Sequence, residues 1–399
     1  MERLRQRLAM LCAEKGTIAK VRPITFERWR FQAKWEEDSA AQSGKKAAAS
    51  HPVLPREAPQ AAAELSRELS RQGLNATASA EVAKALSDES KAAADRLLKF
   101  SHQAASGQKL EYEKLQTRFH AYSVDLRCGK VFLKISREAY GKLALLFRRH
   151  GPAAELPPTP VIDASAGGGD DEAAEIAAAV AETSSDVQAK SPSTREALHL
   201  RMFALLLRYK SLRGHGFQAA IGKPVWQLLR TRLGVACECF ASPLNASLPA
   251  FASAFVDVDG HFGSRGSFFK LAPLSGSYAA NPPFVHAIMD AAAEKMGALL
   301  EAAAASGEHA LSFVVFLPGW EEGAAFAALS ASRFLRAKVL VAAADHGFCD
   351  GASHQRQDPY RHSPYDTCVF VLQTDKASRR WPIGQAPDSF ERELRAAMA

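Results

Sequence analysis

Residues 312–318 read SFVVFLP, a short apolar run rich in β-branched and aromatic side chains. Similar runs stand at 235–241 (VACECFA), 338–344 (KVLVAAA) and 367–373 (TCVFVLQ), and stretches with a helical pattern, such as 284–305, separate them. Strands that alternate with helices indicate an α/β fold with a mostly parallel sheet covered on both faces. Ligands bind beyond the carboxyl ends of the strands in such sheets. We therefore expect functional residues in the loops at 242–245, 281–284 and 318–322, and after residue 344.

The most specific of these loops is Asn281-Pro282-Pro283-Phe284, which follows the strand-like SYAA. An Asn side-chain oxygen and the carbonyl of the next residue can accept both N–H bonds of an exocyclic amine, which draws its lone pair out of conjugation with the ring. The two prolines stiffen the acceptors, and the Phe ring offers a face on which a base stacks. This combination predicts N-methylation of a planar amine by S-adenosylmethionine. The residues alone also permit a plain strand-to-helix turn with prolines in the first helical turn.

Two further segments predict contacts with a cofactor. The run 238–245 (ECFASPLN) has small residues at a strand end, where a ligand approaches the backbone, and Asn245 can hold a charged amino-acid tail. Glu238 is unusual in an apolar strand, because a buried carboxylate needs a partner. The run 257–266 (DVDGHFGSRG) combines acids that can bind ribose hydroxyls with glycines that adopt unusual backbone angles. It lacks the spacing of a dinucleotide fingerprint.

Histidines and cysteines do not predict a metal centre. His346, His354 and His362 fall eight residues apart among aspartates, a spacing that matches no standard site, and contact of His354 or Arg356 with phosphate or RNA is favoured instead. The six cysteines contain no CxxC pair, and Cys237 and Cys239 alternate on a strand and so point to opposite faces.

The N-terminal half has a different composition. The chain has 399 residues and a formal net charge of +7, enough length for two packed domains and no sign of a disulfide miniprotein. Residues 101–150 hold ten Lys/Arg and four Asp/Glu, a surplus of 10 − 4 = +6, which suits either a nucleic-acid partner or a solvated helix face. We predict an N-terminal helical segment at 1–35, a linker at 36–60, a basic helical domain at 61–150, a disordered low-complexity insert at 151–192 and the sheet-containing domain at 193–399.

Two features of the first residues bear on location and packing. No secretory signal and no run of 18 apolar residues occurs, so we expect a soluble, intracellular protein without membrane contact. Thr25 precedes a short predicted helix with Trp29 and Trp35, which either docks on the core or forms an aromatic and basic recognition element.

The C-terminal segments, taken in order, resemble one family. ECFASPLN, SAFVDVDGHFGSRGSFF, SGSYAANPPF, LSFVVFLPGW, SRF and Trp381-Pro382 are similar to the phosphorylated-CTD-interacting-factor family of cap-specific adenosine N6-methyltransferases, over about Thr194–Pro382. A weaker similarity covers 110–130. The resemblance implies a Rossmann-like S-adenosylmethionine-dependent methyltransferase core with an N-terminal helical domain. It also implies a nuclear (or cytoplasmic) enzyme that methylates N6 of the adenosine, usually 2′-O-methylated, next to the 7-methylguanosine cap of mRNA.

The resemblance also implies roles for individual residues. Asn281, Pro282, Pro283 and Phe284 would bind and activate the adenine. The predicted cofactor-binding residues are Glu238, Phe240, Ala241, Ser242, Pro243, Asn245, Asp257, Phe262, Gly263 and Ser264. The predicted substrate-binding residues are Arg265, Trp320, Arg333 and His354.

This chain departs from the family pattern in three places. None of its Trp spacings fits a WW domain, which puts binding to phosphorylated polymerase tails in doubt. Pro318-Gly319-Trp320 replaces Pro-Glu-Trp, and Asp350 stands where a basic residue is expected. Three alternatives therefore stay open: an N6-adenine methyltransferase on internal RNA or DNA, a catalytically silent RNA-binding relative, and a structural scaffold.

Overall fold

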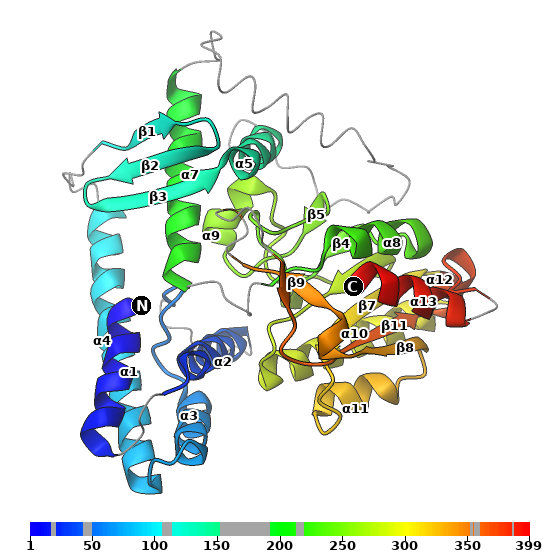
Figure 1. Cartoon of the computed structure of the whole chain (residues 1–399), viewed down its shortest axis with the longest axis horizontal. Coiled ribbons are helices and arrows are strands. Elements are labelled where there is room, and N and C mark those ends of the chain that lie inside the picture. The colour runs from blue at the N-terminus through cyan, green and yellow to red at the C-terminus, as the bar shows by residue number, and fades with distance from the viewer. Residues whose placement is uncertain are drawn as a thin grey trace. The chain divides into compact units, whose positions relative to one another are not determined.

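The computed structural model describes residues 1–16, 21–42, 50–105, 114–151, 192–212, 219–351, 354, 360–384 and 387–399. The chain divides into an N-terminal unit, Met1–Tyr112, and a C-terminal unit, Glu113–Ala399 (Figure 1). No helix among the described residues has the length and apolar character needed to cross a membrane. Nearly all of the predicted insert, residues 152–191, lies outside the described residues.

The N-terminal unit consists of helices in its described ranges. These are α1 (Glu2–Lys15), α2 (Pro23–Gln42), α3 (Pro59–Arg71) and α4 (Ala76–Ala105). Leucines at helical spacing, such as Leu4, Leu8 and Leu11 on α1, pack into one core, because side chains three and four residues apart share a helix face. Trp29 is 4% exposed in this core, as the docked-helix interpretation predicts.

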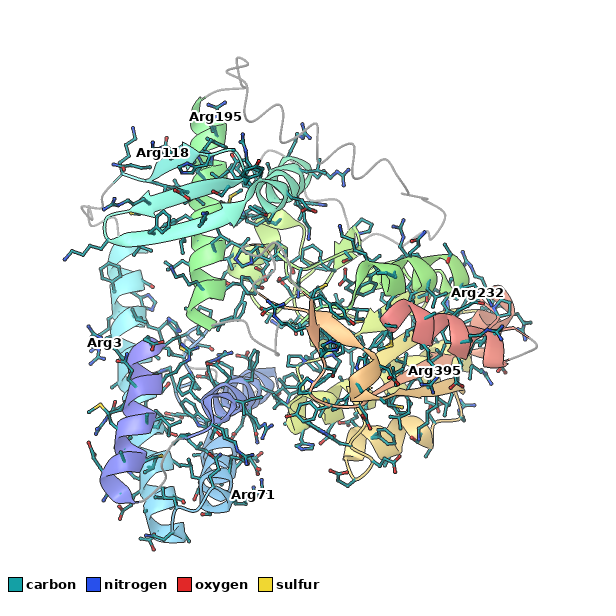
Figure 2. All side chains as sticks on the ribbon, viewed as in Figure 1. Arg3, Arg71, Arg118, Arg195, Arg232 and Arg395 are labelled. Carbon is teal, nitrogen blue, oxygen red and sulfur yellow. The ribbon has the colours of Figure 1, made fainter. Side chains whose placement is uncertain are left out.

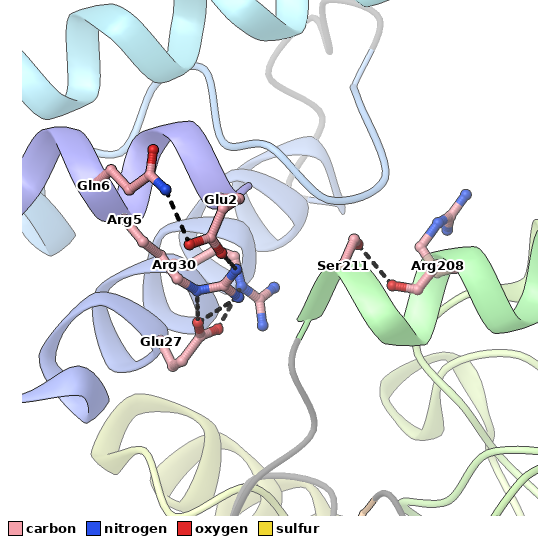
Figure 3. Close-up of polar contacts among 7 residues, drawn as sticks. All are labelled: Glu2, Arg5, Gln6, Glu27, Arg30, Arg208 and Ser211. Atoms are coloured by element: carbon pink, nitrogen blue, oxygen red, sulfur yellow. Dashed lines mark hydrogen bonds and ion pairs between the residues drawn. The ribbon is translucent and has the colours of Figure 1, made fainter. Parts of the chain in front are cut away.

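An ion-pair network is buried beside that core. Glu27 accepts from Arg5 at 2.6 Å and from Arg30 at 3.3 Å (Figure 3). Arg30 is 1% exposed, and its guanidinium lies 4.0 Å from the ring centre of Phe31. Because a buried charge needs a partner, these contacts hold α1 against α2.

The helical interpretation of 61–150 is wrong in part. Three antiparallel strands, β1 (Gln116–Phe119), β2 (Ser123–Cys128) and β3 (Val131–Ser136), interrupt it before helix α5 (Arg137–His150). Charged residues between the apolar ones conceal a period of two, since Leu126, Leu133 and Ile135 are buried while Arg127 and Lys134 are exposed. The predicted linker also begins too early, because α2 continues to Gln42. Thr25 lies inside α2 instead of capping it.

The C-terminal unit contains the predicted sheet. Its six strands are ordered β5-β4-β6-β7-β11-β8. The bounds are β4 Cys237–Glu238, β5 Ala250–Phe251, β6 Gly276–Ala280, β7 Leu311–Pro318, β8 Leu335–Val341 and β11 Thr367–Gln373. Neighbours among β5, β4, β6 and β7 pair in parallel, and β11 is antiparallel to both β7 and β8. The mixed α/β unit is thus consistent with a Rossmann-like core.

Helices cover both faces of this sheet. Helices α8 (Lys223–Leu233) and α13 (Pro387–Met398) pack on one face, and α10 (His286–Ala305) and α11 (Ala324–Ser330) on the other. Helix α12 (Asp375–Arg380) contacts β7 and β11, while α7 (Pro192–Leu212) contacts α9 (Val256–Asp259), α5 and β3. Successive β7 residues alternate between the two cores: Phe313 packs with α10 and α11, and Val314 with α8 and α13. Arg232, labelled in Figure 2, pairs with Glu393 across α8 and α13 at 3.1 Å. A hairpin of β9 (Gly347–Cys349) and β10 (Tyr360–His362) lies beside the main sheet.

Gly234 joins α8 to the strand β4 that leads to the predicted site. It ends α8 in the left-handed conformation (φ 61°), and a β-carbon there would stand 2.3 Å from Nε1 of Trp381. The main-chain carbonyl of Trp381 in turn accepts from Gln373 at the end of β11. Trp381, from the Trp-Pro pair that resembles the family sequence, therefore packs against Gly234, between α8 and β4.

We expect Gly234→Ala to lower the free energy of unfolding by at least about 1–2 kcal/mol, because a β-carbon disfavours positive φ and would clash with Trp381. Denaturant unfolding measures this change. The control is Gly297→Ala in α10, where a β-carbon meets nothing within 4 Å; it should stabilise by about 0.5–1 kcal/mol. Equal effects of the two substitutions would contradict the role given to Gly234.

Candidate active site

Strands β4 and β6 bring the two most informative segments of the sequence together. They pair in parallel, with Glu238 opposite Ala279, so the loops that follow them leave the same edge of the sheet. One pocket opens there. Its lining residues are Ala219, Ala220, Ile221, Trp226, Glu238, Phe240, Asn245, Ala279 and Asn281. Three of the residues predicted to bind a cofactor, Glu238, Phe240 and Asn245, thus line one pocket together with Asn281 of the predicted amine-binding loop.

The side chain of Asn281 is held in one orientation. Its Nδ2 donates to the carbonyl of Ala219 at 3.1 Å. Because a carbonyl only accepts, this contact requires the nitrogen on that side and leaves the Oδ1 acceptor on the other. Pro282 is buried, and the carbonyl of Pro283 accepts from Val285 N at 2.7 Å, which closes the turn into α10. The loop therefore presents a fixed amide oxygen on a stiff backbone.

Phe284 belongs to an aromatic cluster at the same edge of the sheet. Its ring lies edge-on to Trp320, at 6.3 Å between centroids, and to Phe348 at 6.5 Å. Trp320, which follows β7, also contacts Tyr365 at 5.3 Å and His286 at 5.2 Å. Phe284, Trp320 and Tyr365 are half-buried. The aromatic cluster (Phe284, His286, Trp320, Phe348 and Tyr365) thus combines packed rings with partly exposed ring surface.

The structure shows the hydrogen-bond partners that the buried carboxylate of Glu238 needs. It is 5% exposed, and its Oε1 accepts from the backbone N–H groups of Ser247 (2.5 Å) and Leu248 (2.7 Å). Lys142 of α5 donates to the adjoining carbonyl of Ala246. Burial raises the pKa of Glu238 to about 7, against the opposing effect of those two N–H groups and of Lys142. Glu238 therefore fixes the backbone at residues 247–248, beyond the loop 240–245, and also lines the pocket.

The loop at 240–245 is held by its own residues. Asn245 Oδ1 accepts from both the backbone N–H and the hydroxyl of Ser242 at 2.7 Å. The ring of Phe240 packs on Phe268 at 5.3 Å. The backbone N–H of Ala241 donates to the carbonyl of Ala252, the residue after β5. Ser242 and Pro243 are buried. Phe240 and Asn245 line the pocket, and the residues between them form its rigid support.

The segment predicted to contact ribose does not line this pocket. Asp257 is exposed and pairs with Arg208 of α7 at 2.6 Å. Phe262 is fully buried against Phe147. Asp259, also fully buried, accepts from the Tyr209 hydroxyl at 2.7 Å, and burial raises its pKa to about 7.

The glycine-containing part of that segment follows a similar pattern. Gly263 has φ 93°, and a β-carbon there would stand 2.6 Å from the His150 ring, so the glycine permits close packing of α5. The Ser264 hydroxyl bonds that of Ser253 at 2.5 Å, and Arg265 N donates to Phe251 O. These contacts explain the residues as a packed support behind β5, and their cofactor contacts remain predictions.

One of the predicted substrate-binding residues is poorly placed for that role. Arg333 lies at the amino-terminal end of β8, the opposite edge from Asn281, and forms an ion pair with Glu301. We therefore leave it out of the candidate active site. Burial lowers the pKa of His354 to about 4, and its contact with the substrate remains a prediction. Among the described residues, no group of three His, Cys, Asp or Glu side chains is arranged to hold a metal ion.

No sequence pattern predicts the role of the segment 219–221 in this site. Ala220 pairs with Cys349 of β9 through two backbone hydrogen bonds of 2.9 and 2.8 Å, and Ala219 orients Asn281. All of this is done by backbone atoms, so no motif of side chains marks it. The segment closes one wall of the pocket and attaches the β9–β10 hairpin to it.

We expect Glu238→Gln to alter the pH dependence of stability. The folded-state pKa of Glu238, about 7, exceeds its ordinary value of 4.5, so its contribution is present at low pH and is lost as pH rises through 7. The variant should gain about 1–3 kcal/mol relative to the wild type between pH 4 and pH 8. Urea unfolding across this range measures the difference. Glu294→Gln, at an exposed position of α10, is the control, and parallel curves for wild type and Glu238→Gln would refute the assignment.

Comparison with known proteins identifies the region around the pocket. Residues 182–351 match the family model described as the phosphorylated CTD interacting factor 1 WW domain. A human protein named mRNA (2'-O-methyladenosine-N(6)-)-methyltransferase is 38% identical over 191 residues, 45% of this chain and 27% of the human protein. The mouse protein of that name is 37% identical over 207 residues, 49% of this chain and 28% of its own length. The chain thus spans little more than a quarter of these curated relatives.

The family-model match includes the pocket residues from Ala219 to Asn281 and, in this structure, strands β4 to β9 with helices α8, α10 and α11. Residues 182–351 of this chain are thus similar to the phosphorylated CTD interacting factor family.

Proposed function

We propose that this protein transfers a methyl group from S-adenosylmethionine to N6 of the adenosine that follows the 7-methylguanosine cap of mRNA, in the nucleus. The observation that carries the proposal is the single pocket that joins Asn281 to Phe240 and Asn245. The names of the human and mouse relatives support the choice of a cap-adjacent 2′-O-methyladenosine as substrate.

The residues around the pocket suit the proposed cofactor. Phe240 offers an apolar ring surface, the Asn245 side chain a polar contact, and Glu238 a carboxyl group for a ligand that carries positive charge. The loop 240–245 is locked by the Ser242–Asn245 contacts, so it needs no ordering when the ligand binds. S-adenosylmethionine, when bound, supplies an electrophilic methyl group.

The chain's own residues then prepare the amine. The oriented Oδ1 of Asn281 and the carbonyl of Pro282 accept the two N–H bonds of the adenine amino group, which localises the nitrogen lone pair. Phe284 stacks on the base, and Trp320 and Phe348 fix the ring from its edges. Positioning and electrostatic stabilisation supply the catalysis, and the amine proton leaves after transfer.

We expect Asn281→Ala to lower kcat/KM for methyl transfer on the order of 100-fold, the loss typical of a polar group aimed at the reacting atom. Transfer of labelled methyl to a capped RNA that begins with adenosine measures it. Lys376→Ala, which removes a partly exposed lysine of α12 that pairs with Glu308, is the control. Wild-type kcat/KM in the Asn281 variant would remove Asn281 from the mechanism.

Phe284→Ala should reduce kcat/KM in the same assay by about 5- to 150-fold, because stacking of one base on an aromatic ring is worth about 1–3 kcal/mol. Cofactor binding, followed by calorimetry, should be unchanged, since Phe284 does not line the pocket of Phe240 and Asn245. A loss of cofactor affinity with no effect on transfer at saturation would assign Phe284 to the cofactor instead.

The same RNA prepared with and without a cap separates the alternatives. Label at N6 of the first adenosine of the capped RNA alone supports cap-adjacent methylation. Equal labelling of both RNAs indicates an N6-adenine methyltransferase on internal RNA or DNA. Cofactor binding without transfer indicates a silent RNA-binding relative.

A further inference from the structure

The three-stranded sheet β1–β2–β3 has one face covered and one face exposed. Val124, Leu126, Leu133 and Ile135 are buried on the covered face, where Phe119 contacts Tyr140 of α5 and His199 of α7. Directly paired residues of antiparallel strands share a face. The outer face therefore consists of the rows Gln116–Arg127–Phe132 and Arg118–Asp125–Lys134. Figure 2 shows Arg118 on this sheet.

The outer face carries a surplus of positive charge. Arg118, Arg127 and Lys134 are exposed on it, against the single carboxylate of Asp125. That carboxylate accepts from His120 at 2.7 Å, which occupies one of its oxygens. Lys130, in the turn between β2 and β3, adds a further exposed cation at the rim. A polyanion is the partner that matches this distribution.

An exposed aromatic ring lies among these cations. Phe132 is 48% exposed and sits opposite Arg127 in the register, while Tyr122 at the β1–β2 turn is 86% exposed. Lys210 of α7 donates to the Phe132 carbonyl at 2.9 Å, which fixes the backbone that presents the ring. A solvent-exposed Phe gains nothing from the fold, but it offers a π-face to an unpaired base.

We propose that the outer face of β1–β3 binds single-stranded RNA, with a base stacked on Phe132 and phosphates paired with Arg118, Arg127 and Lys134. Sheets with exposed aromatics and flanking cations recognise unpaired bases in this way, because stacking tolerates any sequence and the cations follow the backbone. That this strand is a stretch of the methylated RNA rests on the function proposed above; the binding itself does not.

The test measures binding of the full chain to a fluorescent oligouridine of about 12 nucleotides, within the site sizes of single-strand binders. This probe has neither cap nor adenosine, so it does not engage the candidate active site. Phe132→Ala should weaken binding at least about fivefold. The control Phe100→Ala removes a phenylalanine that is 55% exposed on α4, and it should leave the affinity unchanged.

Salt dependence tests the charges separately. Lys134→Ala should lower the slope of log Kd against log salt by about 0.7, the value for one phosphate contact on a single strand. Lys84→Ala, at an exposed position of α4, should not change the slope. Thermal unfolding of each variant checks that the sheet is intact.

Equal affinities of the Phe132 and Phe100 variants, or displacement of the probe by an acidic phosphopeptide but not by RNA, would overturn the proposal. Methyl transfer to a capped RNA of a few nucleotides, too short to reach a second site, should be the same in wild type and Phe132→Ala. The two proposals can fail separately. If Phe132→Ala weakens oligouridine binding but the wild-type protein methylates no RNA, the proposed function is refuted and the RNA-binding inference stands.

Discussion

The parallel pairing of β4 with β6 is the constraint on which the rest of the C-terminal unit depends. Cys237 lies opposite Tyr278 and Glu238 opposite Ala279, so both strands end at the same level. The loop that continues from β4 and the Asn-Pro-Pro-Phe loop that continues from β6 consequently share one pocket. A slip of one residue in either strand would turn its side chains to the other face and would separate the loops.

Hydrogen bonds to backbone atoms then make this pocket rigid. Glu238 binds two backbone N–H groups of the following loop, Asn245 binds the backbone of Ser242, and Asn281 binds the carbonyl of Ala219. In each case a polar side chain orients a loop through backbone atoms. These contacts fix the loops around the pocket, and under the proposed function this order lowers the entropic cost of aligning two reactants.

The sequence predicted the sheet and its central loops well, for a definite physical reason. Buried strands such as 311–318 need continuous apolar residues, and the residues after them must meet at one edge. Sequence-based prediction failed for features that depend on backbone atoms or on the direction of a strand. Nothing in the residue type of Ala219 reveals that its carbonyl orients Asn281. Arg333 lies in the loop that leads into β8, at the edge of the sheet opposite to Asn281. The strands at 116–136 were missed because exposed cations alternate with their buried residues, which breaks the apolar run that marks a strand.

We propose above that one pocket, between the ends of β4 and β6, holds the methyl donor beside Asn281. A crystal structure of this protein with S-adenosylhomocysteine, the product of methyl transfer, tests it most directly. We expect the ligand to contact Phe240 and Asn245, with its sulfur facing Asn281. A ligand bound elsewhere on the chain, or with its sulfur turned away from Asn281, would contradict it.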